Sequence, residues 1–322
     1  MTQQILLQID SISKTFRPEV FQPPVKSLQS LTIDFTDGEC TGLVGHNGAG
    51  KTTTIRMILG LISPDKGSIK FRGQPLSKTS RSSIGYLAES VKFPSGLTCR
   101  EILTTHISLF RIKGNKERKE LIQETLEKVG LQAFADRKAK SMSKGMQQRL
   151  AWAQATIHEP DLLVLDEPFS GLDPVGRMNM KNWILSEKRR GLTIILCTHE
   201  LPQITSLCDN IHILRQGKLV YSSSKNNRGG TFEIKNLPRY FLDISGPDAK
   251  ELSQFKDLKN LPQWTSQHSE GFLLRLGFSD YHSAASWLSP CLQMGWVIVR
   301  FGDDNSATEE QLLTYFKEEF SQ

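Results

Sequence analysis

The fold of this chain is decided by one stretch, Gly45-His46-Asn47-Gly48-Ala49-Gly50-Lys51-Thr52. It fits the pattern G-x-x-x-x-G-K-[ST] at every fixed position. Residues 41–44 before it are short and apolar, as in a buried strand, and residues 53–59 after it carry an apolar stripe at helical spacing. A strand, a glycine loop and a helix in this order form a cradle whose backbone N–H groups and helix start bind phosphate. A glycine-rich turn before an ordinary helix is the alternative, and the flanking strand and helix argue against it.

The loop and the residue after it are therefore candidate nucleotide ligands. They are Gly45, His46, Asn47, Gly48, Ala49, Gly50, Lys51, Thr52 and Thr53. In such loops the lysine, here Lys51, reaches the β- and γ-phosphates, and the hydroxyl of the next residue, here Thr52, binds Mg²⁺.

A pair of acids follows a second apolar run. Residues 161–166 read as a fully buried parallel strand that ends in Asp166, with Glu167 directly after it. In phosphate-loop ATPases an Asp at this place helps to hold Mg²⁺. Glu167 is then placed to orient and polarise the attacking water. An isolated Asp-Glu at a strand end is usually only the start of a loop, but the apolar run and the upstream phosphate loop favour the functional interpretation.

Composition indicates a globular protein. The chain has 322 residues, 38% of them hydrophobic and 23% charged, which suggests one large domain or two ordinary ones. No stretch approaches the ~18 consecutive apolar residues of a membrane helix, and the N-terminus does not resemble a signal peptide. The net charge of +6 is spread along the chain without interleaved aromatic residues, so we expect no nucleic-acid binding. Five cysteines without C-x-x-C spacing indicate reduced intracellular thiols.

The remaining pattern of the first part alternates strands with helices. Strands are predicted at residues 5–9, 31–35, 69–71, 84–87 and 193–197, and helices between about residues 98 and 136. Asp37-Gly38 is a hairpin turn signal, and Gln216-Gly217 lies between two short strands that we expect to form a hairpin. Residues 113–120 mix charges of both signs and indicate a solvated helix face.

A small, polar stretch beginning at Ser222 separates this part from a second pattern. Strands at residues 240–244, 264–268, 271–278 and 296–301 alternate with helices at 247–255 and 283–294, which is the order of a split βαβ domain. A last helix is predicted at 308–320. We expect domain boundaries at 1–222, with a helical subdomain at about 90–160, a linker at 223–235 and a C-terminal α+β domain at 236–322.

Three further motifs occur in order, and together with the phosphate loop they resemble the nucleotide-binding subunit of ATP-binding-cassette (ABC) transporters over residues 5–220. Ser143-Lys144-Gly145-Met146-Gln147 resembles the family signature, Ser170-Gly171-Leu172-Asp173 its D-loop, and Thr198-His199-Glu200 its switch histidine. The resemblance implies an α/β P-loop NTPase (ABC ATPase) domain with a helical subdomain. The C-terminal part would be a small ferredoxin-like α+β domain.

The resemblance also implies how the site is built. ATP and Mg²⁺ would lie between two nucleotide-binding domains packed head to tail, so that Ser143 and Gly145 touch the γ-phosphate bound by the partner. Asp173 would communicate across this interface. His199 would contact the γ-phosphate and hold the catalytic Glu167 in register with water.

The resemblance also implies that adenine stacks on an aromatic residue early in the chain. Phe16 is the candidate, and Phe21 is a rival because a proline-rich insertion blurs the alignment. An ordinary core aromatic is the alternative for either residue.

Two positions depart from the common family pattern. Lys144 and Met146 replace a glycine and a glutamine of the signature, a form that resembles ABC-2-type exporter subunits. Glu89 stands where the family commonly has a Gln that ligates Mg²⁺ or its water, and a carboxylate can still do so. We therefore expect Thr52, Glu89 and Asp166 to be the metal ligands.

The function implied is that of an ATP-hydrolysing subunit of an exporter. It would work as a dimer, with a homodimer favoured, on a separate transmembrane permease, and so lie peripherally on the cytoplasmic face of the inner membrane. A soluble ABC ATPase acting on ribosomes or DNA is the alternative, but one phosphate loop and only residues 53–142 between loop and signature argue against it. A protein that closes on ATP without hydrolysing it is a third hypothesis, and Glu167 and His199 argue against it. The sequence does not identify the cargo.

Overall fold

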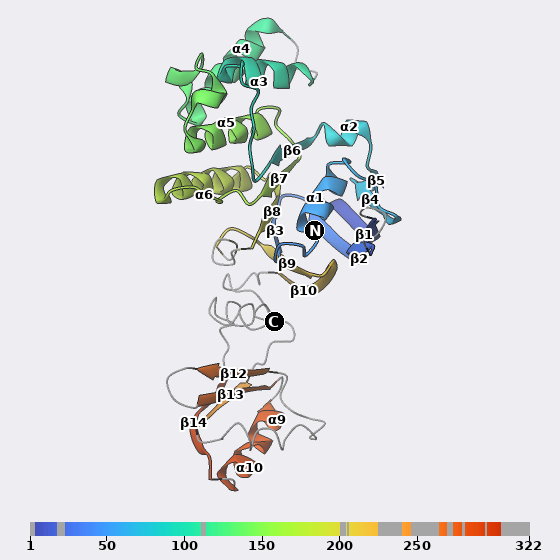
Figure 1. Cartoon of the computed structure of the whole chain (residues 1–322), viewed down its shortest axis with the longest axis vertical. Helices are drawn as coiled ribbons and strands as arrows, with labels where there is room; N and C mark the ends of the chain where they lie inside the picture. The colour runs from blue at the N-terminus through green and yellow to red at the C-terminus, as the bar shows by residue number, and fades with distance from the viewer. Residues whose placement is uncertain are drawn as a thin grey trace. The chain divides into compact units, whose positions relative to one another are not determined.

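The computed structural model describes residues 4–17, 23–110, 114–199, 204, 206–224, 240–245, 264–268, 273–278, 281–293 and 295–303. The chain divides into two compact units, Met1–Ser224 and Lys225–Gln322. Each unit has its own sheet or sheets (Figure 1). Within the described residues, no helix combines the length and the apolar character that crossing a membrane requires.

The centre of the first unit is a six-stranded sheet in the order β10-β9-β3-β8-β7-β6. Three of its inner strands are β3 (Cys40–Val44), β7 (Leu162–Asp166) and β8 (Thr193–Thr198), and every residue in them is buried. β6 (Ile84–Leu87) pairs parallel with β7, and β9 (Asn210–Arg215) pairs parallel with β3. The buried parallel strands expected at 161–166 and 193–197 are confirmed. Because parallel strands share a carboxyl edge, the chain segments that follow β3, β7 and β8 meet there.

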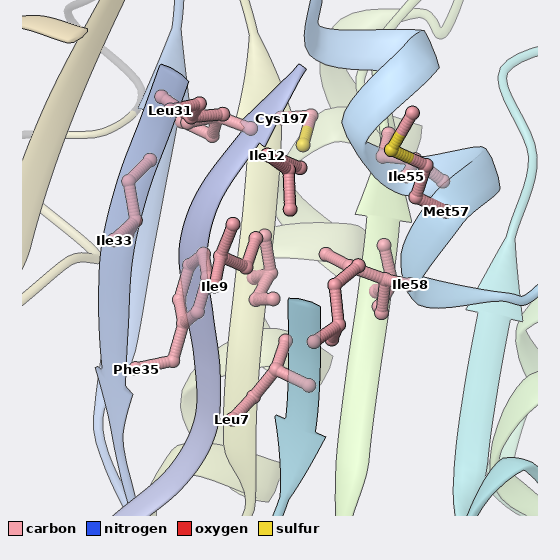
Figure 2. Packing of buried hydrophobic residues seen from close by; sticks show 14 of the residues in the cluster. Leu7, Ile9, Ile12, Leu31, Ile33, Phe35, Ile55, Met57, Ile58 and Cys197 are labelled. Atoms are coloured by element: carbon pink, nitrogen blue, oxygen red, sulfur yellow. The ribbon is translucent and has the colours of Figure 1, made fainter. Parts of the chain in front are cut away.

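A second sheet in the order β2-β1-β4-β5 lies beside the first (Figure 1). It consists of β1 (Ile5–Phe16), β2 (Val25–Thr36), β4 (Lys66–Phe71) and β5 (Gln74–Pro75), all antiparallel. One face of this sheet packs on α1 (Lys51–Ile58). Figure 2 shows Leu7 and Ile9 of β1 facing Ile58 of α1 across the core. This apolar layer fixes the start of α1, and with it the phosphate loop, against both sheets.

The turn at Asp37-Gly38 joins the two sheets and does not form the expected hairpin. β2 before the turn pairs with β1, whereas β3 after it pairs with β8 and β9. The turn itself exists, because Gly38 has φ of 75° and its N–H donates to Thr193 Oγ1 at 2.9 Å. The hairpin prediction was wrong because the buried run of β3 needs partners on both sides, which a parallel sheet centre supplies.

The helices that follow β6 in the chain lie away from the second sheet (Figure 1). They are α3 (Cys99–Ser108), α4 (Asn115–Lys128), α5 (Lys144–Thr156) and α6 (Pro174–Arg189), with short 3₁₀ turns at Gln132–Phe134 and Ala139–Ser141. The short helix α2 (Lys78–Arg81) lies instead near the end of α1, where Arg81 Nη1 donates to Gly60 O at 3.3 Å. Thr98 caps α3 through a reciprocal bond with Glu101, in which both backbone N–H groups are satisfied. Lys116, Glu117, Lys119 and Glu120 are exposed on α4, as the mixed charges predicted, whereas Lys113 lies outside the described residues.

The last strands of the first unit form the expected hairpin around Gln216-Gly217. β9 pairs antiparallel with β10 (Lys218–Ser224). The serines from 222 to 224 belong to this ladder, so the linker predicted to begin there was placed too early. Their small polar side chains misled the prediction, because an edge strand needs only backbone pairing and can be polar.

The second unit contains a four-stranded antiparallel sheet in the order β12-β13-β11-β14. Its strands are β11 (Tyr240–Ser245), β12 (Trp264–His268), β13 (Leu273–Phe278) and β14 (Val297–Asp303). This strand order is that of a split βαβ domain. The helices predicted at 247–255 and 308–320 lie outside the described residues.

The single helix predicted at 283–294 is two helices, α9 (Tyr281–Ser286) and α10 (Leu288–Gln293). Pro290 explains the break, because it has no N–H to donate to the carbonyl of Ser286 four residues earlier.

Candidate functional site

The phosphate loop leaves the carboxyl end of β3 and turns into α1. Gly48 and Gly50 have φ of 86° and 107°, and Gly50 caps the helix in the left-handed region that side chains rarely adopt. At Gly45 a side chain has no room, since a Cβ would lie 2.5 Å from the carbonyl oxygen of Leu214. The glycines thus let the loop bend closely around the helix start, which is the cradle that a phosphate group needs.

Lys51 lies inside this loop, with only 6% of its surface exposed. Its Nζ donates to the carbonyl oxygen of Gly45 and, at 3.3 Å, to that of His46. The same Nζ lies 3.9 Å from Glu167 Oε1. The ammonium group therefore stands between the loop backbone and the acid after β7, where it can bind the terminal phosphates of a nucleotide.

Two hydroxyl groups follow Lys51 at the start of α1. Thr52 is exposed, whereas the Oγ1 of Thr53 lies 2.6 Å from Ser27 Oγ on β2. The Thr52 hydroxyl is accordingly accessible to an ion, and the Thr53 hydroxyl ties the helix start to the second sheet.

Glu167 is held by three bonds at the edge of the central sheet. Its N–H donates to Cys197 O at 2.8 Å, and its Oε2 accepts a hydrogen bond from Thr198 Oγ1 at 2.9 Å. Its Oε1 lies 2.8 Å from Nδ1 of His199, whose side chain is 54% exposed. Glu167 itself is only 8% exposed. A carboxylate fixed in this way can accept a proton from water in a defined direction.

Asp166 is the last residue of β7 and is also buried. Burial, together with the charges of Glu89 and Glu167, raises its pKa to about 6. Lys51 and a hydrogen bond from the Tyr86 hydroxyl act in the opposite direction. Burial and the nearby Asp166 raise the pKa of Tyr86 in turn to about 12. The structure thus brings Asp166, Glu89 and Glu167 into one negative region, beside the loop.

The oxygen ligands at this edge suit Mg²⁺. Protein sites for Mg²⁺ commonly supply one or two carboxylates and leave the other positions to water and phosphate oxygens. The accessible Thr52 hydroxyl and the buried Asp166 carboxylate fit that set, with Glu89 exposed nearby. Within the described residues, no three His, Cys, Asp or Glu side chains form a metal cluster by themselves. The donor set therefore matches an ion that is shared with a bound nucleotide.

The signature and the D-loop form a second group. Ser143 caps α5, and its Oγ accepts a hydrogen bond from Met146 N at 3.3 Å. Asp173 caps α6, and its Oδ1 accepts one from Gly176 N at 2.8 Å. Ser143, Gly145 and Asp173 line one pocket of about 220 Å³, whose lining includes none of residues 45–53. Two helix starts thus line a common hollow that the phosphate loop does not line.

Phe16 ends β1 and is 38% exposed, so its ring is accessible to a planar ligand. Lys14 Nζ lies 5.9 Å from the centre of this ring. The rival Phe21 lies outside the described residues.

Sequence reasoning missed the residues that hold the site in place. Thr198 lies in the motif quoted for His199, but no role was assigned to it. The hairpin turn at Gln216-Gly217 was predicted, but not as part of the site. The Gly217 N–H donates to Ala49 O at 3.0 Å, and the Gly217 carbonyl accepts from Gln29 N at 2.8 Å. This turn therefore stabilises the phosphate loop, although it lies far from the loop in the sequence.

Comparisons with known proteins point to one family. A protein-family model described as ABC transporter matches residues 28–170. The bacitracin transport ATP-binding protein BcrA of Bacillus licheniformis is 42% identical over 199 residues, 61% of this chain and 64% of BcrA. The Nod factor export ATP-binding protein I of Burkholderia pseudomallei (strain K96243) is 37% identical over 196 residues, 60% of this chain and 64% of that protein.

Solved structures share the fold of the first unit. An ATP binding subunit of an ABC transporter is 29% identical, with a TM-score of 0.61 over 68% of this chain and 90% of that chain. The dimeric cassette MJ0796 bound to ADP and Pi is 21% identical, with a TM-score of 0.62 over 69% of this chain and 100% of that chain.

Another similar protein, YxlF of Bacillus subtilis (strain 168), is an uncharacterized ABC transporter ATP-binding protein whose match spans both units. It is 31% identical over 310 residues, which are 96% of this chain and 98% of YxlF. Because this match covers both units at 31% identity, the chain belongs to the family of ABC transporter ATP-binding proteins.

Proposed function

We propose that this chain hydrolyses ATP to drive export through a separate membrane subunit. The observation that carries the proposal is the fixed position of Glu167, between Thr198 and His199 on one side and Lys51 on the other. The transport and export functions named for BcrA and the Nod factor protein support the exporter assignment. In this proposal the first unit, which ends at Ser224, binds and hydrolyses ATP, with the helical subdomain at about 90–160. Residues 236–322, after the linker, are an accessory domain.

The phosphate loop binds and orients the triphosphate. Backbone N–H groups from Gly45 to Thr53 surround the phosphates, and Lys51 neutralises the β- and γ-phosphate oxygens. Thr52 and Asp166, with Glu89, would hold Mg²⁺, and the ion would neutralise charge on the phosphate oxygens. This positioning and charge neutralisation provide most of the catalysis in phosphoryl transfer.

Glu167 acts on the attacking water. Its carboxylate accepts a hydrogen bond from the water and directs the water's lone pair at the γ-phosphorus for in-line attack. Thr198 fixes one carboxylate oxygen at 2.9 Å and His199 fixes the other at 2.8 Å, so the base has one orientation. The exposed part of His199 is free to contact the γ-phosphate.

Two copies complete each site in this proposal. Ser143 and Gly145 of one copy contact the γ-phosphate held by the other, and Asp173 communicates across the interface. The helix N-terminus at Ser143 favours such an anion. The dimeric MJ0796 cassette, which shares the fold, supports this arrangement.

Substitution of the base tests the enzyme assignment. Glu167→Gln keeps the shape of the side chain and removes its basicity, so ATP turnover should fall about 10²- to 10⁴-fold while ATP binding is retained. Glu124→Gln, on the exposed face of α4, is the matched control and should turn over ATP normally. Unchanged turnover in Glu167→Gln would show that Glu167 is not the base.

The partner is tested with the same variant. Glu167→Gln with ATP and Mg²⁺ is used to capture partners from detergent-solubilised membranes, which are identified by mass spectrometry. A polytopic membrane protein in stoichiometric yield is expected, which would place the subunit peripherally on the cytoplasmic face of the inner membrane. Ribosomal or DNA-repair proteins without a membrane partner would instead favour a soluble ABC ATPase.

A further inference from the structure

The last residues of β1 are held by a single carboxylate from the turn before β4. Asp65 Oδ1 accepts a hydrogen bond from Lys14 Nζ at 2.8 Å, and Oδ2 accepts one from Thr15 N at 2.8 Å. Asp65 N donates to Ser13 O at 2.8 Å, and Lys14 Nζ also donates to Ser63 O at 2.8 Å. Four bonds thus join the turn to the three residues that precede Phe16.

These bonds replace a sheet ladder that is irregular at this point. The pairing of β1 with β4 ends at Ser13 opposite Lys66, after a register shift between Asp10 and Ser13. The pairing with β2 continues to Phe16, but its register shifts on both sides of Lys14. Ladder hydrogen bonds alone therefore define the end of β1 poorly, and Asp65 supplies the missing acceptor for Thr15.

Lys14 carries this restraint to the aromatic ring. Its side chain is only 18% exposed although it is charged, because the ammonium group is tied to Asp65 and Ser63. From there Nζ lies 5.9 Å from the centre of the Phe16 ring, within the range in which a cation attracts a ring face. The Lys14 and Thr15 hydrogen bonds lower the pKa of Asp65, so the carboxylate is charged at neutral pH.

We infer that Asp65 and Lys14 are positioning residues for the nucleobase, which set the place of the Phe16 ring and so the affinity for adenine. This inference rests on the assignment of Phe16 as the adenine contact. It predicts that the pair affects binding of the base and leaves binding of the triphosphate to the phosphate loop. A surface ion pair with only a structural role would contribute little to folding and would not change the binding of one ligand relative to the other.

The test compares two ligands that differ only by the nucleoside. Dissociation constants for MgATP and for magnesium tripolyphosphate are measured by calorimetry on the full chain. Stacking of a base on an aromatic ring is worth about 1–3 kcal/mol, so Phe16→Ala should weaken MgATP binding about fivefold or more. Asp65→Asn should weaken it about three- to tenfold, and both variants should bind tripolyphosphate within about twofold of the wild type. The double variant should lose no more than Phe16→Ala alone, because both act through one ring.

Asp136→Asn is the matched control, since Asp136 also forms an exposed pair, with Arg100 at 2.9 Å, but far from β1 in the sequence. It should bind both ligands normally. If Asp65→Asn weakens both ligands equally, or neither, while Phe16→Ala weakens MgATP alone, the inference is overturned and the adenine contact stands. If Phe16→Ala leaves MgATP binding unchanged, the adenine assignment fails, and the inference fails with it, but the assignment of Glu167 is unaffected.

Discussion

Asp166 should destabilise the protein when no nucleotide is bound. Burial and the charges of Glu89 and Glu167 raise its pKa from 3.8 to about 6. An acid whose pKa is higher in the folded than in the unfolded state binds protons preferentially in the folded state. Its ionisation therefore lowers stability, and this loss grows as the pH rises from about 4 to about 6. Asp166→Asn removes the charge with little change in shape and should stabilise the protein at neutral pH.

The size of the gain follows from the pKa. One pKa unit corresponds to about 1.4 kcal/mol, so the change from 3.8 to about 6 sets an upper limit of about 3 kcal/mol at pH 7. Solvent around the exposed Glu89 screens part of the repulsion, and we expect about 1–2 kcal/mol. For a unit of this size each kcal/mol raises the Tm by about 2–4 °C.

The assay is thermal unfolding of the wild type and Asp166→Asn at several pH values, with a chelator and without nucleotide. The variant should have the higher Tm above about pH 6, and the difference should shrink toward pH 4, where the wild-type carboxyl is protonated in the folded state. Asp136→Asn should show no such gain, because Arg100 lowers the pKa of Asp136. A variant no more stable than the wild type at pH 7.5, or a difference that does not depend on pH, would refute the reasoning.

Two further substitutions test residues that hold the catalytic Glu167 and the phosphate loop in place. Thr198→Val removes the hydroxyl that donates to Glu167 Oε2 at 2.9 Å, so single-turnover ATP hydrolysis should slow about tenfold while ATP affinity is kept. An equal loss of ATP affinity would contradict a role of Thr198 in orienting the base. Gly217→Ala would place a Cβ 2.4 Å from Ser27 O and disturb the hydrogen bond to Ala49 O. Chemical denaturation should therefore show a loss of about 2–4 kcal/mol in the free energy of unfolding, and ATP binding should weaken. Gly73→Ala, at a φ of 75° with nothing within 4 Å, measures backbone strain alone, and an equal effect in both variants would exclude the clash.

The sequence predicted most of the first unit because its signals are local. The apolar runs of β7 and β8 and the phosphate loop between β3 and α1 depend on neighbouring residues only. The extension of β1 from residue 9 to Phe16 was not predictable in this way. Ser11 has φ of 50° and the ladder shifts register, so the apolar alternation is broken while the strand continues. Pairing with β2, a tertiary contact, maintains the strand through these shifts.

In the candidate site, too, local motifs were predictable and tertiary contacts were not. Lys51, Asp166 and Glu167 were identified from motifs that lie on single stretches of chain. The contacts that position them come from elsewhere: the Tyr86 hydroxyl from β6 and the Gly217 turn from the end of the first unit. These residue types are common in strands and turns, and no spacing distinguishes them, so only the packed sheet reveals their roles.

The backbone at Glu167 explains why the base needs so many partners. Its φ of 47° lies in the left-handed region, which costs a residue with a side chain about 1–2 kcal/mol. Such a conformation persists only where the surroundings determine it, and here the N–H bond to Cys197 and the carboxylate bond to Thr198 both come from β8. An extended residue at this point would continue the line of β7 and would carry the next side chain to the opposite face. The left-handed turn instead returns the carboxylate toward β8 and Lys51. The left-handed backbone conformation of Glu167 therefore directs its carboxylate into the site, and the hydrogen bonds from β8 stabilise this conformation.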